Sequence, residues 1–389
     1  MKKRTRLIEQ GRAGEEHHGV VNPPVYHAST VLFPTVAALH EASAQPFEGV
    51  YYGRFGTPTH FALERAVAEL EGGHAAVTTS SGLAAISTAL LAFVKTGDHI
   101  LVADSVYGPT RKFCDGLLQK MGVAVEYYDP LIGADIVKLM KANTAVLFME
   151  SPGSLTFEMQ DVPALCAAAK ERDVVTLLDN TWATPLLFSA FEHGVDVSIH
   201  AATKYIVGHA DAMLGLIVTN PSCYQAVKST AVQLGQTAGP DDVYLGLRGL
   251  RTLAVRLRQH AETAKALCDW LDAQPEVTRI LSPAWPDDPG YALWLRDCEG
   301  ASGLFGVVLN RDVSEAAVNA MLDGLRHFGL GYSWGGFESL ILPTHPAESR
   351  TATCWDSGPC LRIHAGLEAA EDLIADLAAG FERLRATTA

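Results

Sequence analysis

The sequence predicts an α/β fold in which a largely parallel sheet lies between two layers of helices. Between about residues 57 and 249, short and nearly continuous apolar runs alternate with helical patterns. Strands that are apolar on both faces are typical of parallel sheets covered on both sides, since a half-exposed strand would alternate apolar and polar residues. The length of 389 residues exceeds the size at which a single core usually stops growing, so we expect two domains.

Residues 1–56 are expected to form an extended arm, because they contain prolines, glycines and short apolar pieces but no long periodic segment. The large domain, assigned to residues 57–249, then begins with a helix over 58–70. Its apolar residues recur three or four positions apart until Gly72 and Gly73 stop the pattern. The predicted strands of the sheet cover residues 75–79, 100–103, 123–128, 145–150 and 174–179.

A long helical segment over 250–273 is expected to link the large domain to a smaller C-terminal domain, residues 250–389. The pattern changes after this helix. Strands are predicted over 304–309, 338–342 and 360–364, and helices over 314–328 and 368–384. This mixture indicates a smaller α+β domain.

Composition argues against several classes of function. A formal net charge of -14 and the lack of a basic run argue against nucleic-acid or anionic-membrane partners. The apolar stretches are too short for a membrane span, and the basic N-terminus lacks the apolar segment of a signal peptide, so we expect a cytoplasmic protein. The seven cysteines are scattered and include no CxxC pair, so disulfides are not expected. The fourteen histidines show no metal-binding spacing, so a metal site is not expected either.

Chemically distinctive residues follow the predicted strands, at the sheet edge where such folds bind ligands. Lys204 comes after a buried strand, and a lysine amine reacts at neutral pH only if it is partly desolvated or near another cation. Asp179 ends the strand over 174–179, where a buried carboxylate needs a partner such as a protonated pyridine nitrogen. Tyr107 would stack on a planar cofactor, and its phenol would transfer protons if a neighbouring cation lowered its pKa.

The strand over 75–79 passes through Ser80, Ser81 and Gly82 into a helix, and a helix N-terminus of this kind suits a phosphate group. Neither a Walker A pattern nor a GxGxxG sequence is present, so a nucleotide is not the favoured ligand. Taken singly, each feature has an ordinary explanation: a surface lysine, a helix N-cap, a strand-end aspartate or a core tyrosine. Their coincidence at one edge of the sheet favours a site for pyridoxal 5'-phosphate (PLP).

The chain resembles the PLP-dependent trans-sulfuration enzymes of Cys/Met metabolism, which have fold type I. The likeness covers nearly the whole chain. It is carried by Tyr-Gly-Arg-Phe-Gly-Thr-Pro-Thr at 52–59, Leu-Leu-Asp-Asn-Thr-Trp at 177–182 and Ala-Thr-Lys-Tyr at 202–205. Several motifs in the family's order make the resemblance specific.

The resemblance implies a role for each strand-end residue. Lys204 would bind the cofactor aldehyde as an imine and would then move the proton of the substrate Cα. Asp179 would bind the pyridine nitrogen, and Tyr107 would stack on the ring and assist proton transfer. The backbone amides of Gly82 and Leu83, together with Thr203, would bind the phosphate.

Further residues would bind the substrate and the neighbouring subunit. Arg362 matches the arginine that grips the substrate α-carboxylate, for which a guanidinium offers two parallel donors. Tyr52 and Arg54 would reach the phosphate of a neighbouring subunit, within a homotetramer made of two active dimers. On this view residues 1–56 form an arm that contacts that subunit and has no core of its own.

The run Ser333-Trp334-Gly-Gly resembles the β-lyases of the family, whereas the γ-lyases and γ-synthases usually carry a Ser-Leu-Gly type of sequence. Ser333 and Trp334 would therefore line the substrate site. The implied reaction is β-elimination of L-cystathionine to homocysteine, pyruvate and ammonia, as in methionine biosynthesis. Two positions depart from the family pattern: Val232 stands near a tyrosine of some β-lyases, and Ala201 replaces a common serine.

Three alternatives stay open at this point. The substrate would be another S-substituted cysteine, or the enzyme would carry out γ-elimination or γ-replacement on the same fold. A third alternative is a non-catalytic scaffold, which would be expected to lack at least one cofactor residue. The cofactor and substrate residues Lys204, Asp179, Tyr107, Tyr52, Arg54 and Arg362 are all present.

Overall fold

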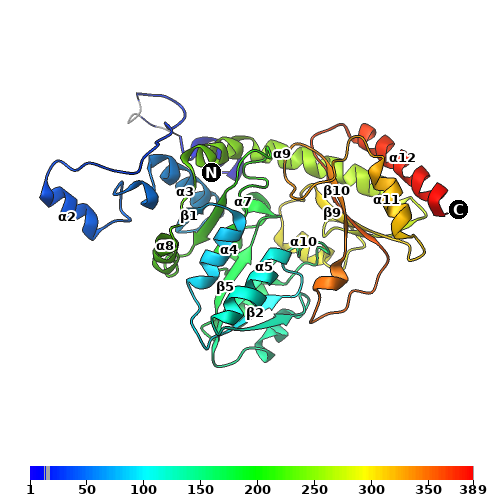
Figure 1. The fold of residues 1–389 in the computed structure, drawn as a ribbon, viewed down its shortest axis with the longest axis horizontal. Helices are drawn as coiled ribbons and strands as arrows, with labels where there is room; N and C mark the ends of the chain where they lie inside the picture. The colour runs from blue at the N-terminus through cyan, green and yellow to red at the C-terminus, as the bar shows by residue number, and fades with distance from the viewer. Residues whose placement is uncertain (13, 15–17, 389) are drawn as a thin grey trace.

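The computed structural model describes residues 1–12, 14 and 18–388, and it contains two sheets connected by one long helix (Figure 1). The larger sheet has the strand order β1-β7-β6-β5-β4-β2-β3. Neighbouring strands from β6 to β3 are parallel, whereas β7 is antiparallel to both β1 and β6. The predicted α/β class with a mostly parallel sheet is confirmed. The strands are β1 (Ala75–Thr79), β2 (His99–Ala103), β3 (Ala124–Tyr128), β4 (Thr144–Glu150), β5 (Val175–Asp179), β6 (Val197–His200) and β7 (Gly215–Thr219).

Both faces of this sheet are buried, which explains its nearly continuous apolar strands. In β2, Ile100 and Val102 belong to one apolar cluster, while Leu101 and Ala103 belong to the cluster on the opposite face. Helices from different parts of the chain supply the two layers. One layer contains α3 (Pro58–Glu71), α6 (Val162–Lys170) and the first half of α9 (Pro240–Asp272), and the other contains α4 (Gly82–Leu91) and α8 (Tyr224–Gln233).

The smaller sheet is antiparallel throughout, with the order β10-β11-β9-β8. A separate apolar cluster joins it to two helices and to the second half of α9. Its elements confirm the predicted α+β character of the C-terminal part. They are β8 (Val277–Leu281), α10 (Tyr291–Asp297), β9 (Leu304–Leu309), α11 (Glu315–Asp323), β10 (Leu340–Thr344), β11 (Cys360–His364) and α12 (Ala370–Thr388).

Helix α9 belongs to both halves of the molecule. The predicted start at 250 is wrong, because the helix begins at Pro240, with Asp241 and Asp242 in its first turn. Leu247 and Leu250 pack in the core of the large sheet, whereas the apolar residues near the end of α9 pack in the second core. The boundary between residues 249 and 250 therefore falls inside a continuous helix, and the two-domain division stays a prediction.

Other predicted boundaries differ by a few residues. The strands over 75–79, 304–309 and 360–364 are confirmed, whereas the strand predicted over 338–342 lies at Leu340–Thr344. The helix predicted over 314–328 is too long, because α11 ends at Asp323 and Gly324 follows it. Strands β7 and β8 are absent from the prediction; β8 is an edge strand with two exposed residues, so its apolar pattern is weak.

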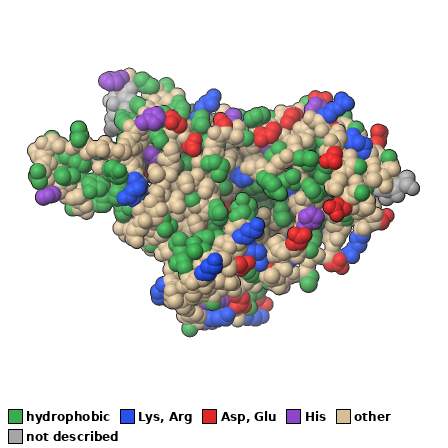
Figure 2. All heavy atoms as spheres, viewed as in Figure 1, with side chains coloured by type: hydrophobic (Ala, Val, Ile, Leu, Met, Phe, Trp, Pro, Cys, Tyr) green, Lys and Arg blue, Asp and Glu red, His purple; other side chains and the backbone are tan. Residues whose placement is uncertain are grey.

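The predicted arm contains two short helices, α1 (Lys3–Glu9) and α2 (Val36–Ala44), and residues 13 and 15–17 lie outside the described part. Leu7 of α1 is buried in the core of the large sheet rather than in a core of the arm, and Arg251 of α9 donates to its carbonyl at 2.7 Å. Helix α2 has no buried residue and projects away from the body (Figure 1). Figure 2 shows apolar side chains gathered on this projection. Leu32, a few residues before α2, is 89% exposed. Within the described residues, no helix is both long and apolar enough to cross a membrane.

Helix α9 offers a test of the core. Leu253→Ala should lower the free energy of unfolding by about 2–5 kcal/mol, because Leu253 is fully buried and its removal leaves a cavity. Val255→Ala, two residues away and 54% exposed, is the control and should change stability by less than about 0.5 kcal/mol. Urea unfolding followed by circular dichroism measures both. Equal losses would show that α9 does not bury the face described here.

Candidate active site

Lys204 lies in the turn that follows β6, and its side chain points toward the C-terminal part of the chain. Its amine donates a hydrogen bond to Ser333 Oγ at 2.5 Å and lies 5.1 Å from the centre of the Trp334 ring. Burial and the nearby cation of Arg362 lower the pKa of Lys204 to about 8. A lysine with this pKa is neutral far more often near pH 7 than an exposed lysine, as expected of a catalytic amine.

The turn over 333–336 is fixed by its backbone. Ser333 has φ +83°, a left-handed conformation that residues other than glycine rarely adopt. Gly335 has φ +85°, and a Cβ there would lie 2.9 Å from the Tyr205 nitrogen and 3.0 Å from the Lys204 carbonyl carbon. The Gly335 amide donates to His364 Nε2 at 3.1 Å. The turn therefore packs directly on the backbone that carries Lys204.

Arg362 lies on β11 and meets Lys204 at the same turn. Its Nη2 donates to the carbonyl oxygen of Ser333 at 3.0 Å, so Ser333 contacts both cations. No described residue accepts a hydrogen bond from Nη1, which leaves this nitrogen available to a bound carboxylate. Burial lowers the pKa of Arg362, but an arginine keeps its charge in proteins.

Asp179 ends β5, and its two oxygens are in different environments. Thr181 donates to Oδ1 from its hydroxyl at 2.5 Å and from its amide at 3.0 Å. Oδ2 receives no hydrogen bond within the described part of the chain. Burial outweighs the hydrogen bonds from Thr181 and raises the pKa of Asp179, so a cationic N–H at Oδ2 would favour its ionised form. This arrangement fits the pyridinium of PLP.

Tyr107 follows β2 and is 42% exposed, so one face of its ring is accessible. Its backbone amide donates to Glu150 Oε2 at 2.6 Å. Burial and the carboxyl groups of Glu150 and Asp179 raise the pKa of Tyr107 despite the opposing effect of Arg362. A raised pKa keeps this phenol protonated near neutral pH. The roles of Tyr107 in stacking and in proton transfer stay predictions.

The proposed phosphate site is the N-terminus of α4. Ser81 caps the helix by accepting the Ala84 amide at 3.1 Å, while the amides of Gly82 and Leu83 have no partner among the described residues. A Cβ at position 82 would lie 2.5 Å from the Cβ of Ala201, so only glycine fits there. Two free amides at a helix N-terminus suit a phosphate.

The Thr203 hydroxyl, predicted to bind the phosphate, already makes hydrogen bonds within the protein. Its hydroxyl accepts the Leu214 amide at 2.8 Å and lies 3.2 Å from the Leu214 carbonyl, to which it donates. Binding a phosphate would require the hydroxyl hydrogen to turn away from that carbonyl. Ala201, at the position of the common serine, has no hydroxyl, but its amide donates to Thr181 Oγ1 at 2.9 Å.

Tyr52 and Arg54 make no contact with Lys204 or Asp179 in the described structure. Arg54 Nη1 donates to the Val232 carbonyl at 2.6 Å, and Tyr52 is 41% exposed. The departure at Val232 is therefore beside Arg54. The roles assigned to Tyr52 and Arg54 at a neighbouring subunit stay predictions.

The prediction missed several residues that shape this site. Glu150 ends β4 directly beside Asp179 in the sheet register, and burial raises its pKa well above the usual range. Thr181 orients Asp179, as a hydroxyl two residues after a strand-end aspartate can. His200, at the end of β6 and four residues before Lys204, forms a buried pair with Glu71, in which Nε2 lies 2.9 Å from Oε2. The strand-end position of Glu150 and the spacing of Thr181 were visible in the sequence, whereas the pairing of Glu71 with His200 over 129 positions was not.

Comparison with known proteins agrees with this geometry. Residues 4–382 match the family described as Cys/Met metabolism PLP-dependent enzyme. Cystathionine beta-lyase MetC of Escherichia coli (strain K12) is 45% identical over 387 residues, 98% of either chain. The enzyme named cystathionine beta-lyase in Haemophilus influenzae is 42% identical over 391 residues, also 98% of either chain. A crystal structure of cystathionine gamma synthase from Xanthomonas oryzae pv. oryzae superposes with a TM-score of 0.90 at 34% identity, covering 100% of this chain and 99% of that one. The chain is a PLP-dependent enzyme and belongs to the Cys/Met metabolism family.

Proposed function

We propose that this protein is a carbon–sulfur lyase that converts L-cystathionine and water to homocysteine, pyruvate and ammonia. The contact between Lys204 and Ser333 is the observation that carries this proposal. It places a weakly basic amine against the Ser-Trp-Gly-Gly turn that resembles the β-lyases, and Arg362 binds the same serine. Relatives that are 45% and 42% identical carry the name cystathionine beta-lyase.

The residues divide the chemistry between them. Bound PLP withdraws electrons from the Cα of an amino acid attached to it. Arg362 would hold the substrate carboxylate, and the neutral amine of Lys204 would remove the Cα proton. Asp179 would keep a proton on the ring nitrogen.

The Cβ–sulfur bond would then break, and Lys204 would return its proton to the sulfur of departing homocysteine. Water releases the remaining three carbons as pyruvate and ammonia. Tyr107 and Trp334 would cover the reacting atoms from solvent, and the raised pKa of Tyr107 makes it a poor base in this scheme.

A γ-elimination or γ-replacement is the second candidate, because the Xanthomonas oryzae cystathionine gamma synthase has the same fold at a TM-score of 0.90. The turn sequence favours β-elimination, since Trp334 is bulkier than the leucine usual in the γ-enzymes. Other S-substituted cysteines would enter the same site.

We also propose a homotetramer in the cytoplasm. The arm exposes several apolar residues, and no residue of α2 is buried. These two observations support contact with another subunit. Tyr52 and Arg54 would then contribute to the site of that subunit. All seven cysteines are free thiols, as is usual in a reducing compartment.

Product analysis tests the reaction. The purified holoenzyme should release pyruvate from L-cystathionine, and Lys204→Ala should lower kcat by about a hundred- to ten-thousandfold or more, because the base is lost. Lys170→Ala, at the exposed end of α6, is the matched control and should retain wild-type turnover. Chromatography of the derivatised 2-oxo acids separates the candidates, and 2-oxobutyrate as the main product would replace β-elimination by γ-elimination.

The reactivity of Lys204 tests the electrostatics of the site. In the apoenzyme, reductive methylation of Lys204 followed by mass spectrometry should rise with pH around a midpoint of about 8. Arg362→Gln should move this midpoint upward, since removing a nearby cation favours the protonated amine. Lys170 in the same sample is the internal reference and should react with the profile of an exposed lysine. An unchanged midpoint in Arg362→Gln would mean that the guanidinium does not act on this amine.

Mixing two inactive variants tests the shared site. Lys204→Ala and Arg54→Ala should each be inactive, the second because it lacks a phosphate contact. If Arg54 serves the neighbouring subunit, refolding an equimolar mixture should restore roughly a quarter of wild-type activity, because hybrid dimers contain one complete site. Lys204→Ala refolded with Lys204→Arg is the control without complementation. No recovery in the mixture would place Arg54 in the site of its own chain or outside any site.

A further inference from the structure

Asp104 follows β2 directly, and its carboxylate is fully buried. The backbone amides of Thr351, Ala352 and Thr353 donate to it at 2.9, 3.1 and 2.9 Å. The two threonine hydroxyls add hydrogen bonds at 3.1 and 2.8 Å. Residues 350–353, which we call the strap, therefore close around a single carboxylate from the large sheet.

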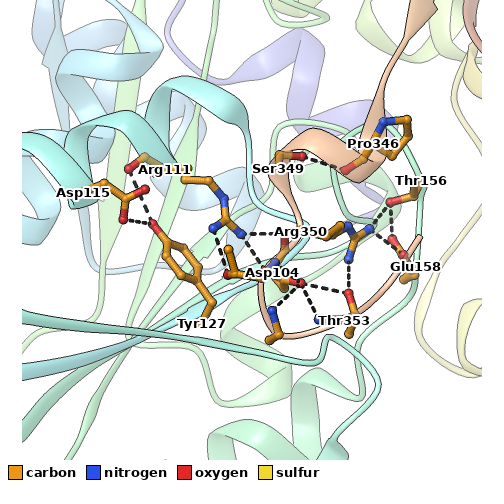
Figure 3. A network of polar contacts seen from close by, with 12 residues as sticks. Asp104, Arg111, Asp115, Tyr127, Thr156, Glu158, Pro346, Ser349, Arg350 and Thr353 are labelled. Atoms are coloured by element: carbon orange, nitrogen blue, oxygen red, sulfur yellow. Dashed lines mark hydrogen bonds and ion pairs between the residues drawn. The ribbon is translucent and has the colours of Figure 1, made fainter. Parts of the chain in front are cut away.

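Two arginines extend this contact on either side (Figure 3). Arg111 of α5 (Gly108–Phe113) donates to Asp104 Oδ1 at 2.7 Å, and its guanidinium lies 3.6 Å from the centre of the Tyr127 ring. Arg350 begins the strap and donates to Glu158 Oε1 at 2.6 Å, with only 3% of its side chain exposed. The strap is thus attached to the large domain at two separate points.

The contact is insensitive to pH in the neutral range. Burial alone would raise the pKa of Asp104, but the hydrogen bonds from Thr351, Thr353 and Arg111 outweigh it and lower the pKa to about 2. Three successive backbone amides around an anion form a concave binding geometry that is common in proteins. Asp104 is therefore ionised in the neutral range and can accept all of these hydrogen bonds there.

The strap connects the two sides of the active site. Tyr107 lies three residues after Asp104 in the same loop, and Arg362 lies nine residues after Thr353, beyond the strap. The ring of Tyr107 and the guanidinium of Arg362 are close enough for each to shift the pKa of the other. The strap thus holds a segment of the C-terminal part against the loop that carries Tyr107, and β11, which carries Arg362, begins seven residues after Thr353.

We infer that Asp104 is a positioning residue for the reaction: by holding the strap, it sets the spacing between Tyr107 at the cofactor face and Arg362 at the substrate carboxylate. The inference rests on the proposed function, because that function gives Tyr107 and Arg362 these roles. Asp104 itself touches neither substrate nor cofactor. Its effect passes through five donors of the strap and one of Arg111.

Asp104→Asn tests the inference in the holoenzyme. The asparagine keeps the shape of the side chain, but its NH2 group would face strap donors instead of accepting from them. KM for cystathionine should rise on the order of ten- to a hundredfold, as for a loosened substrate clamp, with a smaller change in kcat. The visible circular dichroism of bound PLP should weaken, because Tyr107 is less fixed. Asp115→Asn is the matched control, since Asp115 accepts the Tyr127 hydroxyl at 2.7 Å in the same network but does not contact the strap.

A strap variant keeps the test decisive if Asp104→Asn does not fold. Thr353→Val removes one hydroxyl donor and should raise KM in the same direction, while Thr353→Ser keeps the hydroxyl and should restore the wild-type value. Wild-type KM and circular dichroism in Thr353→Val, at a temperature where it is folded, would reduce the strap to a purely structural contact. Failure of the proposed function is distinguishable, because wild-type enzyme would then release no pyruvate while the circular dichroism comparison still reports on the strap.

Discussion

The active site depends on how three buried carboxyl groups at one sheet edge are satisfied. Asp104, Glu150 and Asp179 follow or end β2, β4 and β5, which are neighbours in the sheet. A buried carboxylate without partners is strongly unfavourable, so each must gain hydrogen bonds or hold a proton. The three groups meet this requirement in different ways. Asp104 is surrounded by the strap, Glu150 accepts the Tyr107 amide and favours its protonated form, and Asp179 retains one oxygen for a ligand.

Burial and nearby charges shift the pKa values of Lys204 and Tyr107 in opposite directions. Lys204 becomes a weaker base through burial and the field of Arg362, whereas burial and the nearby carboxyl groups make Tyr107 a weaker acid. The cation of Arg362 lowers the pKa of both groups, but for Tyr107 burial and the two carboxyl groups outweigh this effect. The same low-polarity surroundings that disfavour a charge on Lys204 also keep His364 neutral, with its pKa lowered to about 3, so that it can accept the Gly335 amide.

Much of the fold and of the candidate site could be predicted from the sequence, because strands and strand-end residues are local features. The ends of β1, β9 and β11 followed from short apolar runs, and Lys204, Asp179, Tyr107 and Gly82 were found by their position after such runs. Long-range partners could not be found in this way. Nothing near Asp104 in the sequence indicates that its donors come from residues 351–353, and the start of α9 at Pro240 was hidden because the apolar stripe there is interrupted by glycines.

The turn over 333–336 has a consequence for how substrate preference can change on this scaffold. Ser333 is bound by two cations, and Gly335 lies against the Lys204 backbone in a left-handed conformation. Trp334 alone presents a side chain whose ring contacts are with Tyr205 and Lys204 rather than with its own turn. Among Ser333, Trp334 and Gly335, Trp334 is therefore the residue whose side chain can change with the least effect on the backbone of the turn. Divergence of the pocket should be concentrated there, while the surrounding backbone geometry is inherited unchanged.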